Sequence, residues 1–174
     1  MPDQNPKLVV LTQAMDIERE GMAFYRKAAA SSADARARDV FRSLVEDEVG
    51  HLRMLQAEYD SVNGSGKWLP AAKAIPKVVT GLHLFPPPAK AAGASAASPS
   101  DLEALRFAMD IEQKGYDLYV KAAAETQDKD GQAMYRFLVR MESRHYKILQ
   151  DAYGYLTHPD NWYDDEERPM FEGG

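Results

Sequence analysis

Glu48-Val-Gly-His51 returns 94 residues later as Glu142-Ser-Arg-His145, so one short motif occurs twice in this chain. Each copy follows another glutamate by 30 residues. The chain therefore carries two equal sets of side chains, each with two carboxylates and one imidazole. This combination is typical of a site for two metal ions inside a four-helix bundle. The candidate metal ligands are Glu18, Glu48, His51, Glu112, Glu142 and His145.

The repeat extends well beyond these candidate ligands. Ala14-Met-Asp-Ile-Glu18 returns as Ala108-Met-Asp-Ile-Glu112, again 94 residues later. Further matches on either side keep the same offset, with no gap inside either half. Chance similarity between two helical segments would not keep one register over such a length. The pattern therefore indicates a duplicated helical hairpin.

Apolar residues recur every three or four positions through four segments, which predicts four amphipathic helices. Asn5-Pro6 is a start signal for the first helix, and Asp34 can cap the second. The third is expected to open at the capping-box pattern Ser100-Asp-Leu-Glu, and Asp128 or Asp130 can cap the fourth. The sequence thus predicts one all-α domain over residues 1–174, with a hairpin at 6–60, a crossover at 61–99, a hairpin at 100–156 and a tail at 157–174.

The crossover is the irregular part of the chain, since it is apolar but repeatedly broken by proline. With two antiparallel hairpins that point the same way, we expect it to run the length of the bundle. A helix of about 26 residues is roughly 39 Å long. Part of 71–81 is expected to form a short helix, and the side chains of Trp68 and Phe85 are expected to hold the segment against the bundle.

Composition excludes several classes of function. The 174 residues include no cysteine, which leaves no thiolate metal site and no iron–sulfur cluster in this chain. The net charge of −6 argues against a nucleic-acid partner. The chain contains no run of about 18 apolar residues, so the sequence predicts no membrane span. The N-terminus lacks the pattern of a secretory signal. We therefore expect a cytoplasmic protein.

Four glutamates in otherwise apolar helical stripes need a partner of opposite charge. No lysine or arginine lies on those stripes, whereas two divalent cations would balance the four carboxylates. Oxygen-rich sites with one imidazole per ion suit iron or manganese, and zinc could also occupy them. By the symmetry of the repeat, Glu48 and Glu142 are the better candidates to bridge two ions, because each neighbours a histidine. Glu18 and Glu112 would then each bind one ion.

Other residues near the motifs are candidates for supporting roles. Tyr25 and Tyr119 follow Glu18 and Glu112 by seven residues, on the same helical face. Their hydroxyls could hydrogen-bond to ligand carboxylates across the bundle or supply an electron, or they could simply be core aromatics. The helical glycines, Gly21 and Gly115, leave space for a small ligand or for close helix packing. Asp47 could orient a histidine and has no counterpart in the second half.

The two Glu-x-x-His motifs, the paired glutamates and the two tyrosines resemble the rubrerythrin branch of the ferritin-like superfamily. The resemblance implies a ferritin-like four-helix bundle with a long crossover between helices 2 and 3. It also implies a non-haem site for two iron ions that reacts with hydrogen peroxide or dioxygen, commonly in a homodimer. Such a protein serves as an oxidoreductase in the response to oxidative stress.

The sequence departs from that branch at two points. Typical members carry a rubredoxin domain with four cysteines, so the absence of cysteine here implies a separate electron-donor protein. They also carry a further glutamate where this chain has Gly115. The remaining set of four glutamates and two histidines resembles bacterioferritin and other di-iron oxidases. Two alternatives therefore stay open: a ferroxidase or iron-binding protein without peroxidase turnover, and a bundle in which the metal is only structural.

Overall fold

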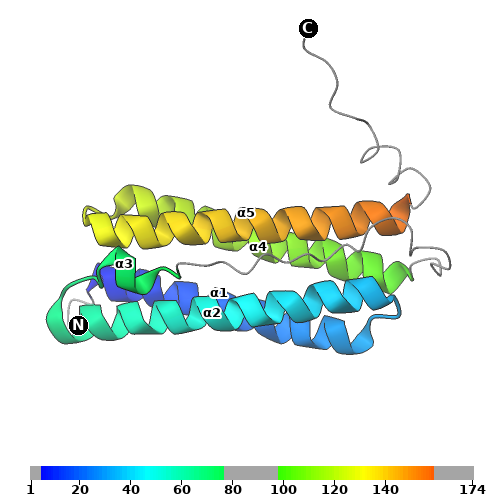
Figure 1. The fold of residues 1–174 in the computed structure, drawn as a ribbon, viewed down its shortest axis with the longest axis horizontal. Helices are drawn as coiled ribbons and strands as arrows, with labels where there is room; N and C mark the ends of the chain where they lie inside the picture. The colour runs from blue at the N-terminus through cyan, green and yellow to red at the C-terminus, as the bar shows by residue number, and fades with distance from the viewer. Residues whose placement is uncertain (1–4, 77–97, 159–174) are drawn as a thin grey trace, which may run out of the picture.

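The computed structural model describes residues 5–76 and 98–158, and these form a bundle of four long helices (Figure 1). No β-strand occurs in these two ranges, which confirms the all-α prediction. No helix in them is long and apolar enough to cross a membrane. The helices are α1 (Pro6–Ser31), α2 (Ala35–Ser65), the short α3 (Ala71–Ala74), α4 (Pro99–Glu125) and α5 (Lys129–Thr157).

The first hairpin begins and ends at the expected kinds of residue. The Asn5 side chain accepts a hydrogen bond from the backbone N–H of Lys7, and the Asp34 carboxylate caps α2. However, α2 ends five residues later than expected. Val62 is buried and so continues the apolar face, and the chain first turns into the left-handed conformation at Gly66, with φ of 72°.

The predicted start of the third helix was wrong by two residues. Ser98 caps α4 instead of Ser100, and Pro99 takes the first helical position, where its missing N–H costs nothing. The buried Asp101 carboxylate has another role. It accepts hydrogen bonds from the backbone N–H groups of Ala33 and Asp34, at 3.3 and 3.2 Å, and thereby ties the start of α4 to the α1–α2 turn.

The two hairpins point in opposite directions, which corrects the expectation that they point the same way. The start of α4 contacts the α1–α2 turn through Asp101, at one end of the bundle. At the other end, the backbone N–H of Ala71 donates to the Asp130 carboxylate at the start of α5. The end of α2 and the start of α4 therefore lie at opposite ends (Figure 1). The connecting residues 77–97, including Phe85, lie outside the described ranges.

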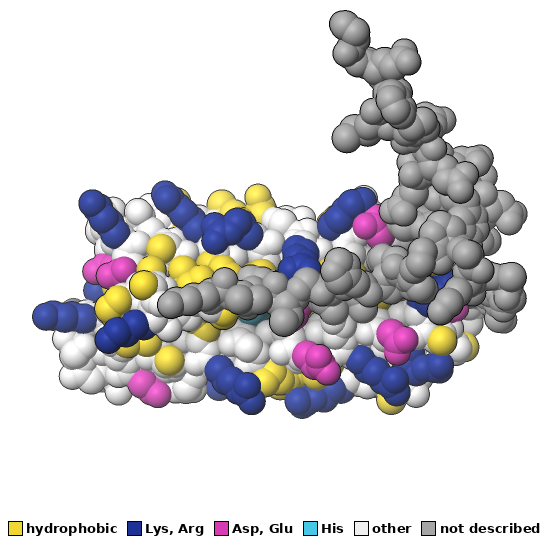
Figure 2. All heavy atoms as spheres, viewed as in Figure 1, with side chains coloured by type: hydrophobic (Ala, Val, Ile, Leu, Met, Phe, Trp, Pro, Cys, Tyr) yellow, Lys and Arg dark blue, Asp and Glu magenta, His cyan; other side chains and the backbone are white. Residues whose placement is uncertain are grey.

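Two apolar clusters fill the bundle, one on each side of a polar layer. The first includes Leu11 and Leu55, and the second includes Phe41 and Leu149. Every long helix contributes to both clusters and crosses the layer between them. On the face drawn in Figure 2, Lys and Arg side chains gather over α5 and α2, and apolar side chains reach the surface near α3.

Trp68 holds the segment after α2 against the start of α5, as its sequence position predicted. Its side chain is 6% exposed and packs edge-on against Tyr135. Gly131 makes this contact feasible, because a Cβ atom there would lie 2.6 Å from Trp68 Cε2. The N-terminal end of α5 thus has a glycine because an indole ring occupies the space of a side chain.

Gly131→Ala is expected to destabilise the fold even though alanine favours helices. Overpacking of this kind costs about 1–3 kcal/mol. Gly50→Ala is the matched control, because a Cβ at this exposed helical position meets nothing within 4 Å. It should stabilise by up to about 1 kcal/mol. Thermal melts and Trp68 fluorescence, in a Trp162→Phe background, would measure both variants. An unchanged melting temperature for Gly131→Ala would contradict this account.

Candidate metal centre

The polar layer contains all six of the glutamates and histidines singled out by the repeat. They come from the four long helices, and none is more than 4% exposed. Their ligating atoms fall into two groups, and within each group these atoms all lie within 4.8 Å of one another. The first group is Glu18, Glu48, His51 and Glu142, and the second is Glu48, Glu112, Glu142 and His145.

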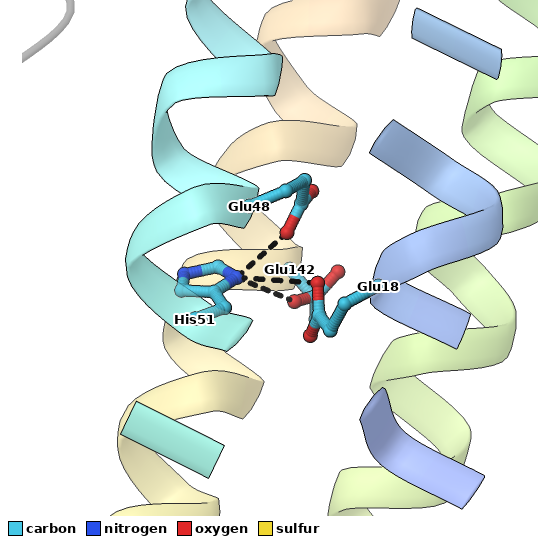
Figure 3. A group of neighbouring side chains, drawn as sticks. All are labelled: Glu18, Glu48, His51 and Glu142. Carbon is cyan, nitrogen blue, oxygen red and sulfur yellow. Dashed lines mark hydrogen bonds and ion pairs between the residues drawn. The ribbon is translucent and has the colours of Figure 1, made fainter. Parts of the chain in front are cut away.

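In the first group, the Nδ1 atom of His51 points at three carboxylates (Figure 3). It lies 2.8 Å from Glu48 Oε2 and 3.6 Å from Glu18 Oε2. Glu142 Oε1 is 3.7 Å away. Glu48 and His51 come from adjacent turns of α2, and three residues rotate a helix by about 60° less than a full turn, so both side chains face the bundle interior.

In the second group, His145 occupies the corresponding place. Its Nδ1 atom lies 3.3 Å from Glu112 Oε2 and 3.4 Å from Glu48 Oε1. The two imidazole rings are nearly parallel, with their centroids 5.4 Å apart. Glu48 and Glu142 thus belong to both groups, whereas each histidine and each remaining glutamate belongs to one.

The close carboxylates shift one another's proton affinity. Burial, with the charge of Glu48, raises the pKa of Glu18 to about 8. Burial and the three other glutamates raise the pKa of Glu142 well above its usual 4.5. Burial would also raise the pKa of Glu48, but hydrogen bonding with Glu18 and the neighbouring histidines hold it well below 4.5. Without cations, the layer therefore holds protons that offset its negative charge.

The histidines respond to the same charges. Burial alone would lower the pKa of His51, but Glu48 and Glu18 raise it to about 10. Burial also acts against the charged form of His145, and Glu112 and the hydrogen bond with Asp47 raise its pKa well above 6.5. Both imidazoles are therefore protonated at neutral pH when no cation is bound.

Tyr25 and Tyr119 each contact the glutamate of the other hairpin. The Tyr25 hydroxyl donates a hydrogen bond to Glu112 Oε1 at 2.5 Å. The Tyr119 hydroxyl likewise donates to Glu18 Oε1. Both rings are fully buried, and burial together with the neighbouring carboxylates raises the pKa of each phenol well above 10. Each tyrosine therefore stays protonated and donates to a carboxylate that sits in the polar layer.

The residues around the polar layer differ between the two halves of the repeat. Asp47 Oδ2 lies 3.2 Å from His145 Nε2, so this aspartate orients the histidine of the other hairpin. His51 Nε2, in contrast, is buried and has no hydrogen-bond partner among the described atoms. A Cβ atom at Gly115 would lie 3.1 Å from Glu142 Oε2, whereas one at Gly21 would meet Ile111 at 3.4 Å. Gly115 makes room for a carboxylate, and Gly21 allows close packing between α1 and α4.

A small pocket of about 210 Å³ opens on the layer between α4 and α5, and the motifs did not predict it. A comparison of the two halves of the repeat could have indicated this pocket, because the two halves differ in polarity at the positions that line it. Polar or aromatic residues border the pocket, while the positions 94 residues earlier hold Met22, Val49 and Leu52. The lining residues are Glu112, Gln113, Tyr116, Glu142, Ser143 and Tyr146.

The donor set of the layer fits divalent cations. It offers carboxylate oxygens and one imidazole nitrogen for each group, which are ligands that iron, manganese and zinc accept. Glu142 Oε1 is also buried without a hydrogen-bond partner among the described atoms, and a cation would supply the missing interaction. The buried cluster can therefore bind metal ions.

Comparison with known proteins agrees with this geometry. Residues 7–155 match the family model described as a ferritin-like domain, so the chain belongs to the ferritin-like domain family. No curated protein matches the sequence. The fold and the buried Glu/His cluster are compatible with a di-iron site of the kind found in ferritin-like proteins.

Two solved structures are similar in fold. One is a two-domain protein from Anabaena variabilis with DJ-1/ThiJ/PfpI-like and ferritin-like domains, at a TM-score of 0.63 and 16% identity. The match covers 97% of this chain and 40% of that one, so this chain spans less than half the length of the Anabaena protein. The other is a hypothetical protein from Pyrococcus furiosus, at a TM-score of 0.65 and 21% identity, with 91% of this chain and 94% of that one covered.

Proposed function

We propose that the chain is a non-haem di-iron oxidoreductase of the rubrerythrin type, which reduces hydrogen peroxide or dioxygen. The observation that carries this proposal is the sharing of Glu48 and Glu142 between two buried ligand groups. A site for one ion would need only one of these groups. Two groups with two common carboxylates suit a pair of neighbouring ions.

In this proposal, Glu48 and Glu142 would hold both ions, because they belong to both ligand groups. Glu18 and His51 would complete the ligands of one ion, and Glu112 and His145 would complete those of the other. Four carboxylates and two neutral imidazoles balance two divalent cations, and manganese or zinc could also occupy the site. Two bound iron ions would supply two electrons and polarise the O–O bond of the oxidant.

The surrounding side chains keep the ligands in position. Tyr25 and Tyr119 donate hydrogen bonds to Glu112 and Glu18 and so restrict the rotation of these carboxylates. Asp47 accepts from His145 Nε2, which leaves Nδ1 free to bind a cation. The apolar clusters above and below the layer exclude water and strengthen every charge interaction inside it.

A ferroxidase or iron-binding protein is the second candidate. It is favoured by the pocket beside Glu112 and Glu142, through which an ion or a small oxidant could reach the layer from solvent. It is also favoured by Gly115, which stands where the rubrerythrin branch has a further glutamate. With only four glutamates, the ligand set resembles that of bacterioferritin.

Several properties of the proposed enzyme follow from the resemblance and from composition. We propose a homodimer that receives electrons from a separate protein, because this chain has no cysteine for a rubredoxin-type iron. We also propose a cytoplasmic location. Light scattering would determine the oligomer, and assembly into a large cage would favour the iron-storage alternative.

Rapid mixing separates these functions. The chain is loaded anaerobically with two ferrous ions, then mixed with hydrogen peroxide or with air-saturated buffer, while the ferric absorbance is followed. We expect much faster oxidation by peroxide, as for a peroxidase. Equal or faster oxidation by dioxygen would instead identify an oxidase or ferroxidase. If neither oxidant oxidises the bound iron faster than it oxidises free ferrous ion, the metal would have only a structural role.

A further inference from the structure

Three buried aromatic rings form a continuous path from the polar layer to one end of the bundle. Tyr119 donates a hydrogen bond to Glu18 in the layer. Its ring stacks on Tyr135, with centroids 6.3 Å apart and planes 27° apart. Tyr135 in turn meets Trp68 edge-on, with centroids 5.6 Å apart. All three side chains are buried, so this path is shielded from solvent along its length.

The path ends at a pocket of about 560 Å³ that Trp68 and Tyr135 help to line. Val10 and Ala122 give the pocket further apolar surface, and Glu125 lies at its exposed edge. Pockets that hold small organic molecules have volumes of about 300–1,000 Å³ and mostly apolar walls. This pocket meets both criteria, and nothing in the proposed metal chemistry uses it.

The first half of the repeat does not contain the same path among the described residues. Tyr25 also contacts a glutamate of the layer, but its ring stacks on Phe41, at 6.2 Å. Phe41 is the counterpart of Tyr135, 94 residues earlier. Its next aromatic contact is Phe24, which also contacts Phe107. Phenylalanine is far harder to oxidise than tyrosine or tryptophan, so these rings do not provide a second source of electrons.

We propose that Trp68, Tyr135 and Tyr119 form an electron relay between the polar layer and this pocket, where a small aromatic reductant of the hydroquinone class binds. The proposal rests on the proposed function only in that the layer holds a centre that needs electrons. Trp68 and Tyr119 change oxidation state in turn. Tyr135 acts through its ring, because its buried hydroxyl has no hydrogen-bond partner among the described atoms to accept the proton.

Each transfer moves one electron. Tyr119 gives an electron to the oxidised centre, and its phenolic proton moves along the hydrogen bond to Glu18. Trp68 then returns an electron to Tyr119 through the ring of Tyr135, and the proton moves back from Glu18. The indole radical cation left at Trp68 takes one electron from the hydroquinone. Two such cycles release two protons and convert the hydroquinone into a quinone.

The relay can be tested in the zinc-loaded chain, without any iron chemistry, because a bound cation that is not redox-active keeps Glu18 deprotonated and able to accept the proton of Tyr119. The chain has no cysteine, so Lys67→Cys provides a single thiol for a ruthenium tris-bipyridine photo-oxidant at an exposed position next to Trp68 that does not line the pocket. A laser flash with an external quencher then oxidises Trp68. Transient absorption should show the indole radical decaying as a tyrosyl radical forms. We expect the tyrosyl signal to disappear in Tyr119→Phe and both signals to disappear in Trp68→Phe.

Variants at Tyr135 test the role of its ring. Tyr135→Phe keeps the ring and should leave the transfer rate nearly unchanged. Tyr135→Leu removes the ring and should slow the transfer by at least an order of magnitude. Phe41→Leu is the matched control, because it removes the corresponding core ring of the other half and should not affect this transfer. Circular dichroism would establish that each variant is folded.

Several results would overturn the relay. These are a tyrosyl radical that persists in Tyr119→Phe, an unchanged rate in Tyr135→Leu, or equal slowing by Phe41→Leu. The pocket is tested with 1,4-hydroquinone, which should reduce the indole radical at a rate that saturates with concentration. A strictly linear dependence would remove the binding site from the proposal. Because no iron is present, these results are independent of whether the iron-loaded chain reacts with peroxide or dioxygen.

Discussion

Glu48→Ala should abolish the binding of both metal ions, whereas Glu18→Ala should remove only one. The reason is the arrangement of the two ligand groups. Glu48 belongs to both groups, but Glu18 belongs only to the group that contains His51. Loss of Glu48 therefore removes an anionic ligand from each ion and leaves three carboxylates for two cations. Loss of Glu18 leaves the group around His145 complete.

Metal content per chain after anaerobic equilibrium dialysis against manganese(II) would measure this difference. We expect about two ions for the original chain, as in other di-metal bundles of this type. Glu48→Ala should bind none, and Glu18→Ala should bind one. Glu46→Ala is the matched control, because this glutamate lies two residues away on α2 but is exposed to solvent. Retention of two ions by Glu48→Ala would overturn the bridging assignment.

Removal of metal is expected to make the stability of the chain fall steeply as pH rises. In the metal-free chain, the pKa of Glu18 is raised from 4.5 to about 8 and that of His51 from 6.5 to about 10. Between pH 4.5 and 8, Glu18 is therefore protonated in the folded state but ionised in the unfolded state. Between pH 6.5 and 10, His51 is likewise protonated in the folded state but neutral in the unfolded state. The free energy of unfolding therefore decreases with rising pH across these windows.

The pKa of Glu48 is shifted in the opposite direction, so its contribution is lost as pH falls below 4.5. Maximum stability of the metal-free chain is thus expected near pH 5. Bound cations take the place of the protons and should remove the decline at higher pH, because metal ions bind the deprotonated ligands. One ion at about 1,000 times its dissociation constant stabilises by roughly 4 kcal/mol. This corresponds to about 2–4 °C in melting temperature for each kcal/mol in a chain of this size.

Melting temperatures between pH 5 and 9, with chelator or with manganese(II), would check this prediction. The expected result is a falling curve with chelator, a flat or rising curve with metal, and a gap that widens as pH rises. His51→Gln should reduce the decline above pH 6.5, because it removes one of the four groups of the layer whose pKa is raised. Parallel curves with and without metal would contradict the proposed exchange of protons for cations.

The sequence alone was sufficient for features that depend on local geometry. Glu48 and His51 face the same direction because a helix turns by a fixed angle for each residue. The 94-residue offset then placed Glu142 and His145 in an equivalent helix, and the charge of four glutamates in apolar stripes called for cations. One error of five residues arose at the end of α2, where the buried Val62 continues the apolar face and the helix first stops at the left-handed Gly66.

Only the tertiary structure decided which residues meet across the bundle. The opposed hairpins bring Tyr25 to Glu112 and Tyr119 to Glu18, and they bring Asp47 to the histidine of the other half. They also bring Trp68 onto Gly131. No period in the sequence encodes these contacts, because they join segments on different helices whose relative direction is set by the packing of the whole bundle. Helical periodicity fixes which face of each helix is buried, and the direction and register of the hairpins fix which residues that face meets.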